Sequence, residues 1–337
     1  MITRRIFTTG LAAGGASAAL AARPASAQAW KPTGPIRLVV PYSQGGSTGG
    51  LAALIQPAMQ AALGQPVELA WIPGNSGIIG ASAVLEAPAD GQTLLLGSSS
   101  LFTAHTFLFG NRLPYVPRTA FAPISRVGTT SVLVAVAASR PWQTIEDVVA
   151  AIRAQPGQLK AATSGVGSIG HMLIAQITEG LGLAGAVELV HYDEGGSLQA
   201  AALVAGDVDI AIAAAPGLLP LLRAGTVRAL ATTGKYRAVW TPELFLVPSI
   251  DEAYPDMAMD VSDWWGLVAR AGTPEPVLAA VNDALGVALE VPAVRAAMSE
   301  QGILPYPDPA PDDFGAFWDE DLPVRQRLVE VSGARLE

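Results

Sequence analysis

Three glycine-rich loops carry most of the hydroxyl groups and backbone amides that could bind a ligand. The first loop, residues 41–50, reads PYSQGGSTGG between a strand-like run and a helix-like segment. Glycines let the backbone approach a ligand closely, and the N–H groups at a helix start bind an anion without a positive side chain. No lysine follows these glycines, so the loop is not a phosphate-binding P-loop. The pattern indicates an anion site, with an ordinary strand-to-helix turn as the alternative.

The second loop contains Gly165, Gly167 and Gly170 in the spacing GxGxxG, after a strand-like run and at a helix start. In dinucleotide-binding folds such a loop holds a pyrophosphate, and an acid at the end of the next strand binds the ribose. Here the next strand-like run leads to the third loop, residues 192–197 (YDEGGS), which contains Asp193 and Glu194. An exported NAD(P)-dependent oxidoreductase is therefore one open interpretation, although no acid or base has a convincing partner.

Candidate catalytic groups are few. His171 stands at a helix start, where a neutral imidazole caps the turn. Neither Ser99 nor Ser168 lies in the GxSxG elbow of a serine hydrolase. We read the pair at 264–265 (WW) as core or hinge packing, and the acidic residues from 308 to 321 as a solvated helix face. The sequence therefore predicts a protein that is not an enzyme.

The composition excludes several classes of protein. The 337 residues include 20 basic and 29 acidic side chains, a net charge of −9, which argues against a nucleic-acid binder. The chain has no cysteine, so disulfides, thiolate metal sites and cysteine nucleophiles are excluded. With only 3 histidines, no metal site is expected.

The N-terminus has the features of an export signal. Arg4 and Arg5 precede an apolar, small-residue run at 10–22, and the segment 25–27 reads ASA, a cleavage-site pattern. We therefore predict a Tat-type signal peptide over residues 1–29, cleaved near residue 27 or 29, and a periplasmic protein.

Strand-like and helix-like segments alternate along the rest of the chain, which indicates an α/β fold. The expected strands are 36–40, 67–71, 93–96, 132–136, 159–162, 187–191, 208–213 and 227–231. The main expected helices are 51–63, 144–154, 171–181, 197–205, 218–224, 274–289, 292–301 and 312–331.

Two segments are predicted as crossings between lobes: 114–128, which is interrupted by proline and glycine, and 256–272, which contains the run DWWGL at 263–267. We therefore predict one lobe from residues 30–127 and 256–337, and a second lobe from residues 128–255. Ligands of open α/β sheets bind at the carboxyl ends of strands, so the glycine-rich loops are expected to face a cleft between the lobes.

A series of short motifs runs through residues 31–333 in a fixed order. They are 35–42 (PIRLVVPY), 45–48 (GGST), 63–67 (LGQPV), 73–77 (PGNSG), 89–95 (ADGQTLL), 113–115 (LPY), 121–124 (FAPI), 164–168 (SGVGS), 206–209 (GDVD), 225–231 (GTVRALA), 265–267 (WGL) and 271–274 (AGTP). Together they resemble the receptor family of the tripartite tricarboxylate transporters, the Bug-type solute-binding proteins, although no single motif is decisive.

The resemblance implies a periplasmic binding protein of two α/β lobes, a type II-like clamshell in which each lobe is a mixed sheet flanked by helices. It implies a monomer without cofactor or metal, which closes over a small organic acid and passes it to a permease of one large and one small membrane subunit. Carried onto this sequence, the ligand-binding residues are Ser43, Gln44, Gly45, Gly46, Ser47, Thr48, Ser98, Ser99, Thr163, Ser164, Ser168 and Tyr192, with Asp193 beside them.

Three positions depart from the family pattern. Gly49 stands where the family commonly has Asp, Asp193 where a Lys is frequent, and Ala213 where a polar residue is usual. If Asp193 or Glu194 faces the cleft, a second ligand carboxylate would meet like charge. We therefore hypothesise a ligand with one carboxylate and a neutral, apolar or cationic far end. A sensory receptor of the same fold is an alternative that the sequence does not separate from transport.

Overall fold

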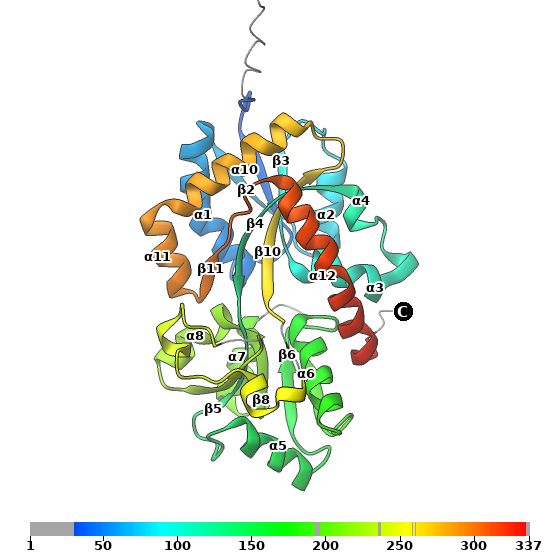
Figure 1. The fold of residues 1–337 in the computed structure, drawn as a ribbon, viewed down its shortest axis with the longest axis vertical. Coiled ribbons are helices and arrows are strands. Elements are labelled where there is room, and N and C mark those ends of the chain that lie inside the picture. The colour runs from blue at the N-terminus through cyan, green and yellow to red at the C-terminus, as the bar shows by residue number, and fades with distance from the viewer. Residues whose placement is uncertain (1–29, 193–195, 235–236, 258, 260, 335–337) are drawn as a thin grey trace, which may run out of the picture.

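The computed structural model describes residues 30–192, 196–234, 237–257, 259 and 261–334. Within these residues the chain forms two mixed β-sheets, each with helices on both faces, and the two resulting lobes lie one above the other in Figure 1. The α/β, two-lobed architecture predicted from the sequence is confirmed. The predicted signal peptide, Asp193 and Glu194 lie outside the described residues.

The first sheet has the strand order β11-β4-β10-β3-β1-β2. The strands are β1 Ile36–Val40, β2 Val67–Trp71, β3 Thr93–Ser98, β4 Phe121–Thr130, β10 Asp263–Arg270 and β11 Ile303–Pro305. Strand β1 runs parallel to both β2 and β3, whereas β10 runs antiparallel to β3 and β4.

Helices cover both faces of this sheet. On one face pack α1 Ser47–Leu63, α10 Glu275–Glu290 and α11 Pro292–Glu300. On the other pack α2 Ile78–Leu85 and the first half of α12 Pro311–Ser332, near the short helices α3 His105–Phe109 and α4 Pro117–Ala120. The strand residues alternate accordingly, with Leu38 and Val40 in one cluster and Val39 in the other.

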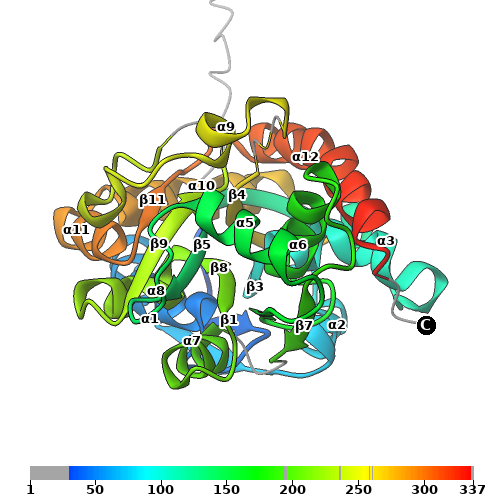
Figure 2. The same cartoon turned by 90° about the horizontal axis from the view of Figure 1, so that it is seen from below.

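The second sheet has the strand order β7-β6-β8-β5-β9. Its strands are β5 Val132–Ala137, β6 Lys160–Thr163, β7 Glu188–His191, β8 Ile210–Ala214 and β9 Val227–Thr232. One face packs against α5 Ile145–Ala154, α6 Ile169–Gly180 and α9 Ile250–Ala253, and the other against α7 Gly196–Ala205 and α8 Ala215–Arg223. Figure 2 shows α7 and α8 on the same side of the molecule as α1.

The chain passes between the sheets at two adjacent points. It leaves the first sheet after Thr130 and returns to it at Asp263, and these two residues are paired across β4 and β10. The segments 114–128 and 256–272, predicted as crossings, therefore contain two strands of the first sheet. Proline is tolerated at Pro123 because β11 pairs only with residues 128–130 of β4, so that side of β4 is an edge at residue 123.

Helix α12 joins the two lobes. Phe314 and Trp318, near its start, belong to the core of the first sheet, whereas Leu328 and Val329, near its end, belong to the core of the second. Its C-terminal half packs against α6. The relative position of the lobes is therefore set by this helix as well as by the crossing strands.

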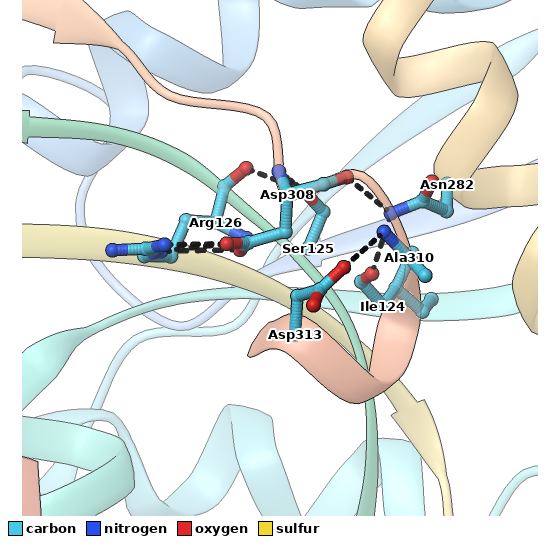
Figure 3. Close-up of polar contacts among 7 residues, drawn as sticks. All are labelled: Ile124, Ser125, Arg126, Asn282, Asp308, Ala310 and Asp313. Atoms are coloured by element: carbon cyan, nitrogen blue, oxygen red, sulfur yellow. Dashed lines mark hydrogen bonds and ion pairs between the residues drawn. The ribbon is translucent and has the colours of Figure 1, made fainter. Parts of the chain in front are cut away.

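The acidic segment before and within α12 is not simply a solvated face, contrary to the sequence prediction. The side chain of Asp308 is 1% exposed and accepts hydrogen bonds from the backbone N–H and the guanidinium of Arg126 (Figure 3). Asp321 accepts hydrogen bonds from Arg325 and from the indole N–H of Trp264. These two carboxylates are tolerated in the protein interior because each accepts hydrogen bonds from a donor that lies far away in the sequence or on the next helical turn.

Candidate functional site

The first glycine-rich loop ends at the start of α1, where the helix has no side-chain cap. Ser43, Gln44 and Gly45 are exposed, and the half-buried Ser47 makes no side-chain hydrogen bond within the described residues. The first-turn amides of a helix have no partner in the helix itself. The start of α1 therefore offers N–H groups and one free hydroxyl.

Two neighbouring residues explain the shape of this helix start. The hydroxyl of Thr48 is buried and accepts a hydrogen bond of 2.9 Å from the indole Nε1–H of Trp265, which attaches the first turn to β10. A Cβ atom at Gly49 would lie 2.5 Å from the carbonyl oxygen of Gln44. Glycine at position 49 thus lets the loop fold closely over the helix.

A cleft of about 760 Å³ separates this helix start from the second lobe. Its volume is within the usual range for small-molecule sites. One wall comes from the first loop, α1 and the end of α11, and the opposite wall from α7 and α8. The lining residues are Gly45, Gly46, Ser47, Gly50, Ala200, Ala201, Val204, Ala205, Pro216, Gly217, Pro220, Leu221 and Gln301. Sequence reasoning did not predict the α7 and α8 wall, because its apolar residues carry no group that would indicate ligand binding.

The predicted residues Ser98 and Ser99 bind other parts of the first lobe. Ser98 is the last residue of β3, two residues beyond the expected strand end, and its hydroxyl is 2.8 Å from Tyr42 Oη. Ser99 is fully buried and donates a hydrogen bond of 2.6 Å to Asp263 Oδ1. Burial raises the pKa of the Asp263 carboxyl and raises that of Tyr42 to about 12. These hydroxyls therefore connect the loops after β1 and β3 to the crossing strand.

The residues around the second glycine-rich loop are also hydrogen-bonded within the second lobe. The buried Thr163 hydroxyl is 2.7 Å from His191 Nδ1, and its carbonyl accepts the N–H of Tyr192 at 2.9 Å. Ser168 caps α6 by accepting the N–H of His171 at 3.3 Å, and the half-buried Ser164 lies between these residues. The site residues predicted in the second lobe therefore cluster at the start of α6 and the end of β7.

His171 acts as a cap, as the sequence predicted. Its Nδ1 accepts a hydrogen bond of 3.0 Å from the N–H of Gly167, and its ring centroid lies 4.9 Å from that of His191. Burial, with a smaller contribution from His191, lowers the pKa of His171 to about 4. The ring is therefore neutral at pH 7, which an acceptor role requires.

The glycines of the GxGxxG spacing have local structural explanations. Gly165 and Gly167 adopt positive φ angles of 118° and 75°. A Cβ at Gly170 would lie 2.2 Å from the carbonyl oxygen of Ile212, so this glycine lets α6 pack closely on β8. Because the Gly167 N–H is already donated to His171, one of the amides that a pyrophosphate would need is occupied. The loop is thus accounted for without a nucleotide.

The residues that the structure describes lack both a metal-binding cluster and a single helix that could span a membrane. They contain no group of three or more His, Asp or Glu side chains placed to hold a metal ion. They also contain no single helix that is long and apolar enough to cross a membrane, although α10 and α11, bent by 74°, pass the length and composition test as a pair.

Comparisons with known proteins agree with this architecture. The model of the "Tripartite tricarboxylate transporter family receptor" matches residues 51–333. Protein BugT of Bordetella pertussis is 30% identical over 325 residues, 96% of this chain and 96% of that protein.

Solved structures of similar proteins superpose over most of the chain. MatC from Rhodopseudomonas palustris, with bound malate, is 29% identical with a TM-score of 0.78 and covers 88% of this chain and 99% of its own. A second R. palustris protein, with adipate, is 28% identical with a TM-score of 0.82 and covers 90% of this chain and 98% of its own. On the family match, the BugT identity and the shared fold, the chain belongs to the receptor family of the tripartite tricarboxylate transporters.

Proposed function

We propose that this protein is a periplasmic solute receptor that binds a small organic acid between its lobes and delivers it to a membrane permease of one large and one small subunit. Export by a Tat-type signal over residues 1–29 and a monomeric state belong to the same proposal. The observation that carries it is the uncapped start of α1 at the edge of a cleft of about 760 Å³. Relatives with bound malate and adipate support a carboxylate as the ligand class.

The predicted ligand-binding residues divide into two groups in this proposal. Ser43, Gln44, Gly45, Gly46 and Ser47 are exposed or half-buried and supply the direct contacts with the carboxylate. In the second lobe, Ser164, Ser168 and Tyr192 are half-buried and complete the site on closure, as would Asp193.

The remaining predicted residues do not contact the ligand but hold the contacting residues in place. Thr48, Ser99 and Thr163 are buried and already hydrogen-bonded, and Ser98 is bonded to Tyr42. Ligand binding favours the closed arrangement of the lobes because contacts from both sides form only there. The proposed lobe boundaries, residues 30–127 with 256–337 and residues 128–255, place the hinge near the paired Thr130 and Asp263.

Thermal unfolding with a ligand panel tests the proposed function. The panel contains mono-, di- and tricarboxylates, amino acids, aromatic acids, NAD(H) and NADP(H). A ligand at a hundred times its Kd stabilises a protein by about 2.7 kcal/mol, which shifts the melting temperature by a few degrees. We expect a shift with at least one organic acid and none with the nucleotides. A shift with NADP(H) alone would overturn the receptor assignment.

A charge placed at the helix start tests the site itself. Ser47→Asp introduces a carboxylate where the ligand carboxylate is proposed to bind, and acids at a helix N-terminus are well tolerated. We expect a folded protein that has lost at least tenfold in affinity for its acid ligand. The matched control is Ala293→Asp, which places the same charge in the first turn of α11, on an exposed residue outside the cleft lining. Equal affinities for the two variants would contradict the placement of the site.

A further inference from the structure

The wall of the cleft opposite α1 consists of apolar side chains from two helices. From α7 come Ala200, Ala201, Val204 and Ala205, and from α8 come Pro216, Gly217, Pro220 and Leu221. In each helix these residues form pairs four positions apart, so one continuous face of each helix lines the cleft. Val204 is 46% exposed, although it is a large apolar residue.

This wall offers no charge to a ligand. The sequence of α7, GSLQAAALVA, contains no ionisable side chain, and α8, APGLLPLLR, contains only Arg223. The guanidinium of Arg223 is already bound to the Glu243 carboxylate and, through Nη2 at 2.6 Å, to the carbonyl of Glu300. Within the described lining, the only polar side chains are Ser47 and Gln301, both on the first-lobe side.

From this asymmetry, and resting on the proposed function, we propose that the ligand is a monocarboxylate with an aliphatic or aromatic body. Its carboxylate binds at the start of α1, and its apolar body packs against α7 and α8. A second carboxylate placed against α7 and α8 would lose its hydration without gaining a charged or hydrogen-bonding side chain from their lining residues, which is unfavourable. The apolar wall thus narrows the sequence-based hypothesis of a neutral, apolar or cationic far end to an apolar one.

The lining of small residues also leaves space for a broad ligand. Ala200, Ala201, Ala205 and Gly217 project little beyond their backbones, whereas Val204 and Leu221 supply the larger contact surfaces. Burying one methylene group raises an affinity by about three- to fourfold. Affinity should therefore rise along a series of acids as the chain lengthens, until the body fills the cleft.

The test compares acids that are matched in length but differ at one end. Isothermal titration calorimetry of the purified protein would measure Kd for hexanoate against adipate, octanoate against suberate, and 4-methylbenzoate against terephthalate. We expect each monocarboxylate to bind at least tenfold more tightly than its dicarboxylate partner, and octanoate to bind more tightly than hexanoate. Tighter binding of the dicarboxylates would overturn this inference and leave the proposed function intact, whereas no binding of any carboxylate would overturn the proposed function.

A charge on the apolar wall should reverse this preference. Val204→Lys places an ammonium group on the cleft wall at an already half-exposed position, so folding should be preserved. We expect the ratio of adipate to hexanoate affinity to rise by at least tenfold. The matched control is Val287→Lys on α10, at a position that is 62% exposed and outside this cleft, which should leave the ratio unchanged. If Val204→Lys leaves the ratio unchanged as well, the assignment of α7 to the ligand-contacting wall is wrong.

Discussion

The buried ion pair between Arg126 and Asp308 should be one of the most sensitive points of the first lobe. The guanidinium of Arg126 lies between two aromatic rings, 4.0 Å from the centroid of Tyr306 and 3.9 Å from that of Phe317. Asp308 accepts its Nε–H at 3.0 Å and the backbone N–H of Arg126 at 2.7 Å (Figure 3). The backbone N–H of Asp308 in turn donates to the hydroxyl of Ser125 at 2.8 Å. The pair therefore attaches the segment before α12 to strand β4.

The substitution Asp308→Ala would remove the counter-charge and leave the cation in place. The side chain of Arg126 is only 16% exposed, so water cannot fully replace the lost carboxylate. Breaking a buried pair on one side costs about 3–5 kcal/mol, and this small residual exposure favours the lower half of that range. With about 2.1 cal/mol/K of unfolding entropy per residue, the 308 residues that follow the predicted signal peptide (30–337) would melt about 5–6 °C lower.

Urea unfolding followed by circular dichroism measures this cost. The matched control is Asp319→Ala, which breaks the exposed pair of Arg118 and Asp319 and should cost less than about 1 kcal/mol. Asp308→Asn keeps the shape and some of the hydrogen bonds, so it should fall between the two. If Asp308→Ala destabilised the protein no more than Asp319→Ala does, the buried pair would have no special role and the reasoning would be refuted.

Two further predictions concern the packing of α6 and the buried histidines. Gly170→Ala should destabilise the protein by about 1–3 kcal/mol, because the added methyl group would lie 2.2 Å from a carbonyl oxygen of β8. Gly286→Ala in α10 should instead stabilise the protein by about 0.5–1 kcal/mol, because the added methyl group meets nothing within 4 Å. If the two substitutions shifted the midpoint of urea unfolding in the same direction, the packing argument would be contradicted. Burial lowers the pKa of both His105 and His171 from 6.5 to about 4, so the unfolded chain binds more protons than the folded chain between these values. The free energy of unfolding should have its full value above pH 6.5 and should fall by on the order of 3 kcal/mol per histidine as the pH drops toward 4. His105→Asn should reduce this loss between pH 7 and pH 4.5, and an unchanged pH dependence would contradict the assignment.

Several features of the fold were predictable because their causes are local. The alternation of apolar strands and helical segments comes from side-chain periodicity, which the chain carries without any long-range contact. The helix after the first loop was also expected, at 51–63, but α1 begins four residues earlier, at Ser47 within the GGST motif, and has no side-chain cap. His171 could be assigned as a cap because it is only four residues from Gly167.

Other features were misread because proline and glycine are ambiguous in a single sequence. Strand β4 contains Pro123 and Gly128, and proline and glycine in the segment 114–128 favoured an irregular crossing there. The sheet accepts these residues because one side of β4 is an edge near Pro123, and because the pairing of β4 with β10 shifts register twice. The partners of a strand, which decide whether proline costs a hydrogen bond, are not written in its own residues.

The sequence alone determined the α/β class and the family, because each rests on the periodicity of neighbouring residues or on the order of short motifs. Only the tertiary structure decided which polar groups are free. Ser99 was a plausible ligand contact until its hydroxyl was found on Asp263, 164 residues away. Only the structure likewise showed which residues of α7 and α8 line the cleft and which pack on the sheet, with Ala200 and Leu221 doing both. Both faces are apolar, and an apolar residue buries equally well in a core or against a ligand, so periodicity could not distinguish them.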